Sequence, residues 1–349
     1  MINASFIVLF ASLLLLLLFW GFKTLPSERW QMIASVPLVK RADGCWVGLN
    51  LTYYGFFSAT GYTVAVALMI LLMASIRMPA SFVIVFIAAI VAIAVPASRL
   101  VAAIVEHKRN TFTIAGAAFV STLLLPPLAL EMQHVLRTRL HLEIYLLPVL
   151  AGAAITYVIG ESIGRLACIS FGCCYGIPLR QASPAVARLF RRHSLVLHGH
   201  TKKAAYASGL AGEPLVPVQA LTSLLLALAG LAGIALFLAQ MWRAAALVPI
   251  VVTWGWRVVS ESLRADFRGG GRISSYQIMS VIALLYSLLF ISMMSSGGPS
   301  PNLAVAFSRV VSVPIIAGLQ LFWITLFLYY GRSRVTASTV AFHVLADQS

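Results

Sequence analysis

Nine apolar runs of about twenty residues each limit the folds open to this sequence, because ~20 apolar residues in a helix span a bilayer. Within lipid, backbone amides must be paired inside a helix or a closed barrel. The chain is 60% hydrophobic and only 10% charged. We therefore expect an all-α polytopic membrane protein, with spans at residues 4–22, 51–76, 80–105, 112–130, 144–163, 216–240, 244–262, 275–294 and 311–331.

Three connections between the runs are long. Residues 23–49 form a polar, basic connection, and residues 164–215 form the longest segment predicted to lie outside the membrane. Residues 295–310 are rich in Ser, Gly and Pro at their start, which is typical of a flexible linker. The Pro126–Pro127 pair is expected to kink or end its helix.

The net charge of +15 indicates contact with anionic lipid headgroups rather than with nucleic acid, for which the sequence has no motif. Alternating the nine spans places the 164–215 segment on the same side as 23–50, 106–111, 263–274 and 332–349. That side collects most Lys and Arg, so the positive-inside rule favours the cytoplasm. A site for anionic lipid would itself gather positive charge, so the sequence leaves the orientation open.

The stretch Gly164 to Gly176, GRLACISFGCCYG, gathers a charge, three cysteines and three glycines within thirteen residues. Glu161 precedes Arg165 by four positions, so the two share a helix face if the helix continues. An ionisable residue at the end of a membrane span is a functional-site hypothesis by default. We expect Arg165 to belong to a site or to a structural ion pair.

A second charged pattern occurs in the run 244–262, where Arg257 and Glu261 are also four residues apart. An arginine below the membrane end of a helix costs roughly 2.5–3.5 kcal/mol on insertion scales, so it needs a partner. Two arginines at span ends of different helices could converge, and guanidinium groups suit phosphate recognition. The pattern favours phospholipid chemistry over two independent structural ion pairs.

Two further patterns are weaker. His198 and His200 could suggest a metal, but no third ligand lies at a recognisable spacing, so we expect solvated loop histidines and no metal or cofactor. Cys173 and Cys174 could be nucleophilic or could serve as small packing residues; no histidine lies beside them in the sequence.

Taken together, these patterns resemble the bacterial prolipoprotein diacylglyceryl transferases. The thirteen-residue frame of the family signature holds Gly164, Arg165 and Gly176, and the family's Arg and Glu four apart correspond to Arg257 and Glu261. Other elements are similar in order and spacing, over about residues 50–294: Tyr54-Gly55 with Gly61, Pro217-x-Gln219, Arg264-Ala265-Asp266, and Tyr276-Gln277.

The resemblance implies a seven-helix core at 50–294, with one extra transmembrane helix in each flanking unit, 1–49 and 295–349. It implies transfer of a diacylglyceryl group from phosphatidylglycerol, or another anionic phospholipid, to the lipobox cysteine thiol of a prolipoprotein. Arg165 and Arg257 would hold the phosphate, and Glu261 would orient Arg257. Substrate contacts are expected from Tyr54, Gly55, Gly164, Gly176, Gln219 and Arg264. The enzyme would lie in the bacterial plasma membrane, with the site facing the outer leaflet.

The sequence departs from the family pattern at several polar positions. No histidine occurs near Thr113 to Gly116, where the family has one, and Val216 stands where its His-Pro begins. Cys168, Phe171 and Cys173 replace two asparagines and a glutamate. Two rival functions follow: a catalytically degenerate member that binds anionic lipid or lipoprotein, and a small-solute transporter. No internal repeat supports the transporter.

Overall fold

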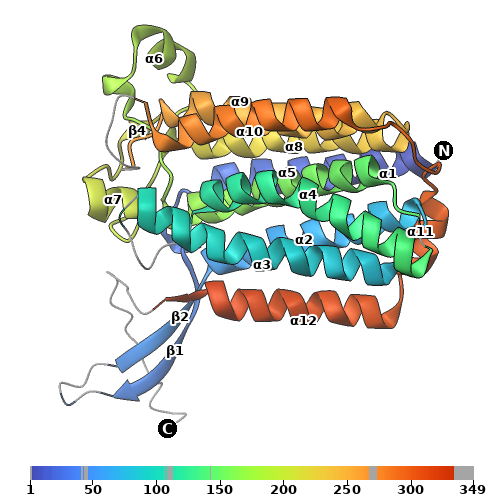
Figure 1. Cartoon of the computed structure of the whole chain (residues 1–349). Coiled ribbons are helices and arrows are strands. Elements are labelled where there is room, and N and C mark those ends of the chain that lie inside the picture. Colours follow the sequence, from blue (N-terminus) through green and yellow to red (C-terminus); the bar gives the residue numbers. More distant parts are fainter. Residues whose placement is uncertain are drawn as a thin grey trace.

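Nine long helices packed side by side form the body of the protein (Figure 1). The computed structural model describes residues 2–40, 42, 46–105, 107, 113–141, 143–266 and 273–333. Within these ranges the helices of 18 residues or more are α1 (Ile2–Thr24), α2 (Tyr53–Ser75), α3 (Ala80–Val105), α4 (Ile114–Leu140), α5 (Leu146–Phe171), α8 (Val218–Leu238), α9 (Trp242–Glu261), α10 (Ser275–Met293) and α12 (Val313–Tyr330). They coincide with the nine apolar runs, which confirms the all-α polytopic fold.

Eight of these helices are long and apolar enough to cross a membrane by themselves, and α9 is the exception. Arg243 and Arg257 lower its mean hydropathy. It nevertheless packs lengthwise against α8 and α10 within the bundle. Helix α9 therefore depends on protein partners to accommodate its charges.

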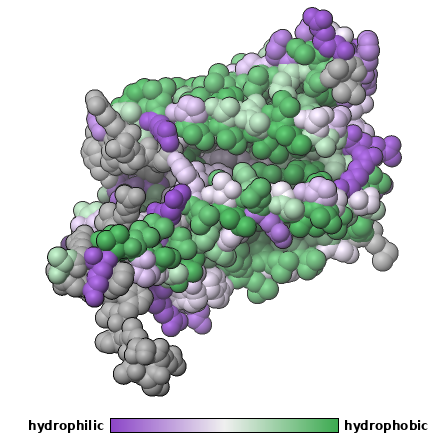
Figure 2. Space-filling view, turned by 90° about the horizontal axis from the view of Figure 1, so that it is seen from below, coloured by the Kyte–Doolittle hydropathy of each residue, from purple (hydrophilic) through white to green (hydrophobic). Residues whose placement is uncertain are grey.

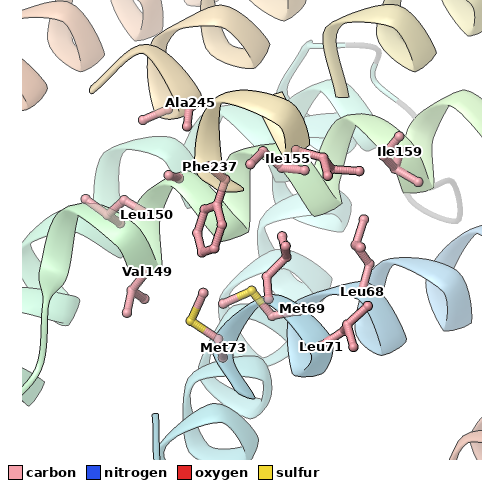
Figure 3. Close-up of a cluster of buried hydrophobic side chains, with 14 of the residues drawn as sticks. Leu68, Met69, Leu71, Met73, Val149, Leu150, Ile155, Ile159, Phe237 and Ala245 are labelled. Carbon is pink, nitrogen blue, oxygen red and sulfur yellow. The ribbon is translucent and has the colours of Figure 1, made fainter. Parts of the chain in front are cut away.

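Helix α5 is the central element, and twenty of its 26 residues are buried. Its aliphatic side chains pack with hydrophobic side chains of α2 and α8 in one buried cluster, in which Figure 3 labels Ile155, Met69 and Phe237. Glycines allow α2 and α5 to approach closely: a Cβ on Gly61 would lie 2.6 Å from the carbonyl oxygen of Gly160. Small residues at helix crossings are typical of membrane bundles. The packing fixes the position of every polar group on α5.

The side of the bundle is mostly hydrophobic, and hydrophilic side chains gather mainly toward its ends (Figure 2). Helix α12 has no buried residue along its length and lies at the edge of the bundle. Such a surface is suited to hydrocarbon and confirms a multi-pass membrane protein.

One end of the bundle carries the extramembrane structure (Figure 1). Strands β1 (Met32–Lys40) and β2 (Trp46–Thr52) form an antiparallel hairpin, and β5 (Arg332–Ser333) pairs with β2. The same end holds α6 (Pro184–Phe190), α7 (Lys203–Ser208), the short 3-10 helices Glu28–Trp30 and Leu179–Gln181, and the paired strands β3 (Leu195–Val196) and β4 (Pro214–Leu215).

Backbone contacts join these segments. His198 N donates to Pro26 O at 3.0 Å, and Ile177 N donates to Leu263 O at 2.9 Å. The predicted grouping of the 23–50, 164–215 and 263–274 segments on one side is therefore confirmed for their described residues.

Two expectations about the connections are wrong: the helix end at residue 164 and the flexible linker at 295–310. The segment predicted to leave the membrane at residue 164 remains helical to Phe171, so Arg165 lies inside the bundle. The 23–49 connection contains β1 and part of β2, which the sequence did not predict. The linker at 295–310 contains helix α11 (Leu303–Val310), anchored by the buried Leu303 and begun by the Asn302 side chain. Of the two outcomes expected at Pro126–Pro127, a kink or a helix end, the structure excludes the end, because α4 continues to Leu140.

Lys202 is a fully buried cation in the extramembrane layer. Its Nζ donates to Leu25 O at 2.9 Å and to Ser170 O at 2.5 Å, so it ties the 172–217 segment to the ends of α1 and α5. Burial lowers its pKa from 10.5 to about 7, against a smaller opposing effect of the Glu28 carboxylate. The unfolded chain consequently binds more protons than the folded one between these pH values.

We expect stability to rise with pH in that window. A lowered folded-state pKa gives stability that is lost as pH falls toward 7, and the change from pH 9 to pH 7 amounts to about 2 kcal/mol. Thermal unfolding in detergent at both pH values should show this rise in the wild type and in the neighbouring Lys203→Met control. Lys202→Met should lack it; an equal pH dependence in all three proteins would contradict the assignment.

Candidate active site

Two arginines from different helices converge on one buried carboxylate. Arg165 of α5 and Arg257 of α9 both bind Glu161 Oε1, with Arg257 Nη2 at 3.0 Å. Arg257 Nη2 also lies 3.2 Å from Oε2 and 3.2 Å from the hydroxyl oxygen of Tyr157. The Tyr157 hydroxyl in turn donates to Oε2. Each of the three charged residues is less than 9% exposed, so the cluster is a buried ionic network.

Helix geometry brings these groups together. Tyr157, Glu161 and Arg165 are spaced by four residues along α5 and so lie on one face. The lengthwise packing of α9 against α5 then supplies Arg257 from across the interface. Two arginines and one glutamate leave a formal charge of +1 in the cluster, which favours an anionic ligand.

The cluster lies on the wall of a large cavity of about 2020 Å³. Ligand pockets usually measure about 300–1,000 Å³, so this one has room for more than a small polar molecule. Most of its lining is apolar, including Ile87, Val91, Leu125 and Ile250. Its charged lining residues include the ionic cluster of Glu161, Arg165 and Arg257, and also Glu28, Arg29, Lys203, Glu261, Arg264, Asp266 and Arg332. An amphipathic molecule with a charged head and apolar tails fits this distribution.

Arg264 and Arg165 contribute further guanidinium N–H donors near the ionic cluster. Arg264 makes a two-pronged ion pair with Asp266, with both N···O distances 2.8 Å. Arg165 Nε is buried and has no hydrogen-bond partner among the described residues. An unpaired donor on a buried guanidinium costs free energy unless a ligand binds it.

Glu161, rather than Glu261, is the observed carboxylate partner of Arg257, and this corrects the expected orienting role of Glu261. Glu261 does line the cavity. The i,i+4 spacing favoured Glu261 because it considers one helix only. The contact between Arg257 and Glu161 joins α9 to α5. The only sequence pattern that involved Glu161 was its i,i+4 spacing to Arg165, within α5.

The remaining expected contacts divide into two groups. Tyr54, Gly164 and Arg264 line the cavity. Gly164 gives it width, because a Cβ there would meet nothing within 4 Å. Gly55 and Gly176 are close-packed: a Cβ would lie 2.1 Å from the Gly331 Cα and 2.3 Å from the Val216 carbonyl oxygen, respectively, and a substrate contact by either stays a prediction.

Gln219 is not among the described residues that line the cavity; it supports the turn after α5, and its expected contact with substrate stays a prediction. It is 1% exposed, and its Nε2 donates to the Cys173 carbonyl at 2.9 Å. That turn carries Cys173 and Cys174 back toward Cys168, and all three cysteines line the cavity. Sequence reasoning left their role undecided.

Comparison with protein families identifies the relatives of this chain. The family model for prolipoprotein diacylglyceryl transferase matches residues 45–293. The chain belongs to this family. A comparison with curated proteins gives no match.

The diacylglyceryl transferase match covers helices α2 to α10 and so contains the whole ionic cluster. Helices α1, α11 and α12 lie outside it. The segment where a family histidine was expected, near Thr113 to Gly116, also reaches the cavity: Thr113, Ile114 and Ala115 line it. This chain therefore places uncharged side chains at a part of the wall where the resemblance implies an imidazole.

Proposed function

We propose that this protein transfers a diacylglyceryl group from phosphatidylglycerol to the lipobox cysteine thiol of a prolipoprotein. The observation that carries the proposal is the meeting of Arg165 and Arg257 on the wall of a large, mostly apolar cavity. The acyl chains occupy the apolar part, and the headgroup phosphate lies at the arginines. The acceptor sulfur forms a bond to the carbon of the diacylglycerol unit that carries the phosphate. The bond between that carbon and the phosphate oxygen breaks, and the headgroup leaves as glycerol phosphate with the electron pair of that bond.

The arginines stabilise the charge that develops on the departing phosphate. Fixed donors directed at developing charge are commonly the largest catalytic contribution in enzymes. The three side-chain bonds of Arg257 described above leave from Nη2, whereas the guanidinium has two further nitrogen donors. Arg257 thus binds a phosphate without first releasing Glu161.

Glu161 does not serve as the proton acceptor for the thiol in this scheme. Both of its oxygens already accept bonds, Oε1 from the two arginines and Oε2 from Tyr157 and Arg257. Its role is to hold the two arginines together and aligned. Glu261, on the cavity wall, and the lipid phosphate are the other candidates for that proton.

Gly164 provides a test of the space beside Arg165. A valine there would extend into the cavity next to the phosphate position, because nothing lies within 4 Å of its Cβ. We expect Gly164→Val to lower transfer about tenfold or more with little change in thermal stability. Gly318→Val on α12, where a Cβ also meets nothing within 4 Å, is the matched control. Equal activity in both variants would place the lipid elsewhere.

We propose that the protein resides in the bacterial plasma membrane with the α6–α7 end outside, because exported prolipoproteins would meet the site there. A cysteine at Ser194, with the native cysteines replaced, should react with a membrane-impermeant maleimide added to intact cells. Modification only after the cytoplasmic side is exposed would contradict this orientation.

The decisive test is transfer of labelled phosphatidylglycerol to a lipobox peptide by the purified protein, together with complementation of a strain depleted of its own transferase. Thioether product and growth support the enzyme. Saturable lipid binding with no thioether product and no growth would identify a catalytically degenerate, lipid-binding family member instead.

A further inference from the structure

Three thiols form a compact cluster beside the arginines. The Sγ atoms of Cys168, Cys173 and Cys174 all lie within 4.8 Å of one another. Cys168 is buried, and the other two are partly exposed and line the cavity with it. Zn–S bonds measure about 2.3 Å, which separates sulfurs on one tetrahedral ion by about 3.8 Å. Small side-chain rotations would therefore bring all three sulfurs to one ion.

The backbone conformation after α5 brings the three cysteines together. Gly172 ends α5 in the left-handed conformation, with φ of 73°. The Cys173 amide then donates back to the Cys168 carbonyl at 3.0 Å, and Gln219 holds the Cys173 carbonyl from α8. Cys174 also adopts a left-handed φ of 58°. Such a conformation is uncommon outside glycine, and strain of this kind gathers at functional sites.

Two guanidinium groups lie close enough to the cysteines to interact with them. Arg165 interacts electrostatically with Cys168 and Cys174, and Arg264 interacts with Cys174. Three thiolates with Zn²⁺ carry a net charge of −1, which these guanidinium groups offset. Catalytic zinc sites have three protein ligands and leave the fourth position for water or substrate. The cavity lies next to all three cysteines and gives a fourth ligand access.

We propose that Cys168, Cys173 and Cys174 bind a zinc ion whose fourth position takes the acceptor cysteine thiol. The catalytic part of this inference rests on the proposed transferase function. When the acceptor thiol replaces a zinc-bound water, its proton passes to water in the cavity and its sulfur binds as thiolate. A sulfur electron pair then forms the bond to the glycerol carbon, and the electron pair of the breaking C–O bond leaves with glycerol phosphate.

This arrangement activates the thiol by coordination and so does not depend on Glu261 or the lipid phosphate as the proton acceptor. Metal coordination activates a nucleophile without a neighbouring base. Thr113 to Gly116 offer no imidazole, and Glu161 is committed to Tyr157 and the arginines. Zinc coordination thus gives these three cysteines one function.

The binding test uses the full-length protein in detergent. We expect one zinc per chain by elemental analysis, and cobalt substitution should give sulfur-to-cobalt charge-transfer absorption. Single Cys→Ser changes at 168, 173 and 174 should each lose the zinc, whereas Cys45→Ser at the remaining cysteine should retain it. Because a variant can misfold, the wild type supplies a second measurement: zinc should slow alkylation of these three thiols by N-ethylmaleimide. No zinc and no protection, or a disulfide within the trio, would overturn the site.

The activity test separates this inference from the proposed function. Wild-type protein stripped with a chelator should lose at least tenfold in transfer rate and recover it with zinc, but not with magnesium. Full transfer by the stripped protein would overturn the activating role. Stoichiometric zinc in a protein that transfers nothing, with or without metal, would overturn the transferase function and support the zinc site alone.

Discussion

Arg257→Lys is expected to lower transfer by about 10²-fold or more while the protein still folds and inserts. Lysine keeps the charge but loses the planar fork that can bind Glu161 and a phosphate simultaneously. In the wild type Arg257 Nη2 contacts both oxygens of Glu161 and the hydroxyl oxygen of Tyr157. A single ammonium group cannot bind Glu161, Tyr157 and the lipid phosphate simultaneously in this geometry.

The matched control for this change is Arg243→Lys. Arg243 lies at the opposite end of α9, where it is exposed and donates to the Met294 carbonyl at 2.7 Å. The measurements are transfer of labelled lipid to a lipobox peptide and thermal unfolding in detergent. Full activity of Arg257→Lys would mean that charge alone suffices, and the fork geometry proposed here would be lost.

Hydropathy was sufficient to predict the fold. Each of the nine apolar runs is a helix in the structure, including α9, whose two arginines keep it below the hydropathy of an independent span. The helix ends were predicted less well. The chain around Arg165 was expected to leave the membrane, yet α5 continues to Phe171 because Glu161, Tyr157 and Arg257 compensate the charge.

The sequence pointed to the meeting of Arg165 and Arg257, but it did not identify the carboxylate that joins them. The i,i+4 pattern correctly suggested a partner for Arg165, but it assigned Glu261 to Arg257, whose observed partner is Glu161 on another helix. The pattern carries no information about which helices pack together. The cysteine cluster depends on a left-handed turn at Gly172, which brings residues five and six positions apart over one another.

The largest effect on stability is expected at Glu161, and the effect should be asymmetric. Removing one partner of a buried ion pair typically costs about 3–5 kcal/mol because a charge remains uncompensated. Glu161→Leu leaves two buried arginines facing each other, whereas Arg257→Leu leaves a balanced Glu161–Arg165 pair. We therefore expect Glu161→Leu to destabilise the protein by at least that amount and Arg257→Leu to destabilise it much less.

A variant without all three charges completes the comparison. Leucine at 161, 165 and 257 should recover most of the stability lost by Glu161→Leu, because no unpaired buried charge remains, while transfer stays abolished. Glu213→Leu is the surface control: its ion pair with Arg180 is largely exposed, and such pairs contribute about 0–1 kcal/mol. Thermal unfolding in detergent gives the order of stability. If Glu161→Leu is no less stable than Arg257→Leu, the carboxylate does not hold the two arginines together, and the phosphate would have to be bound by a different arrangement of them.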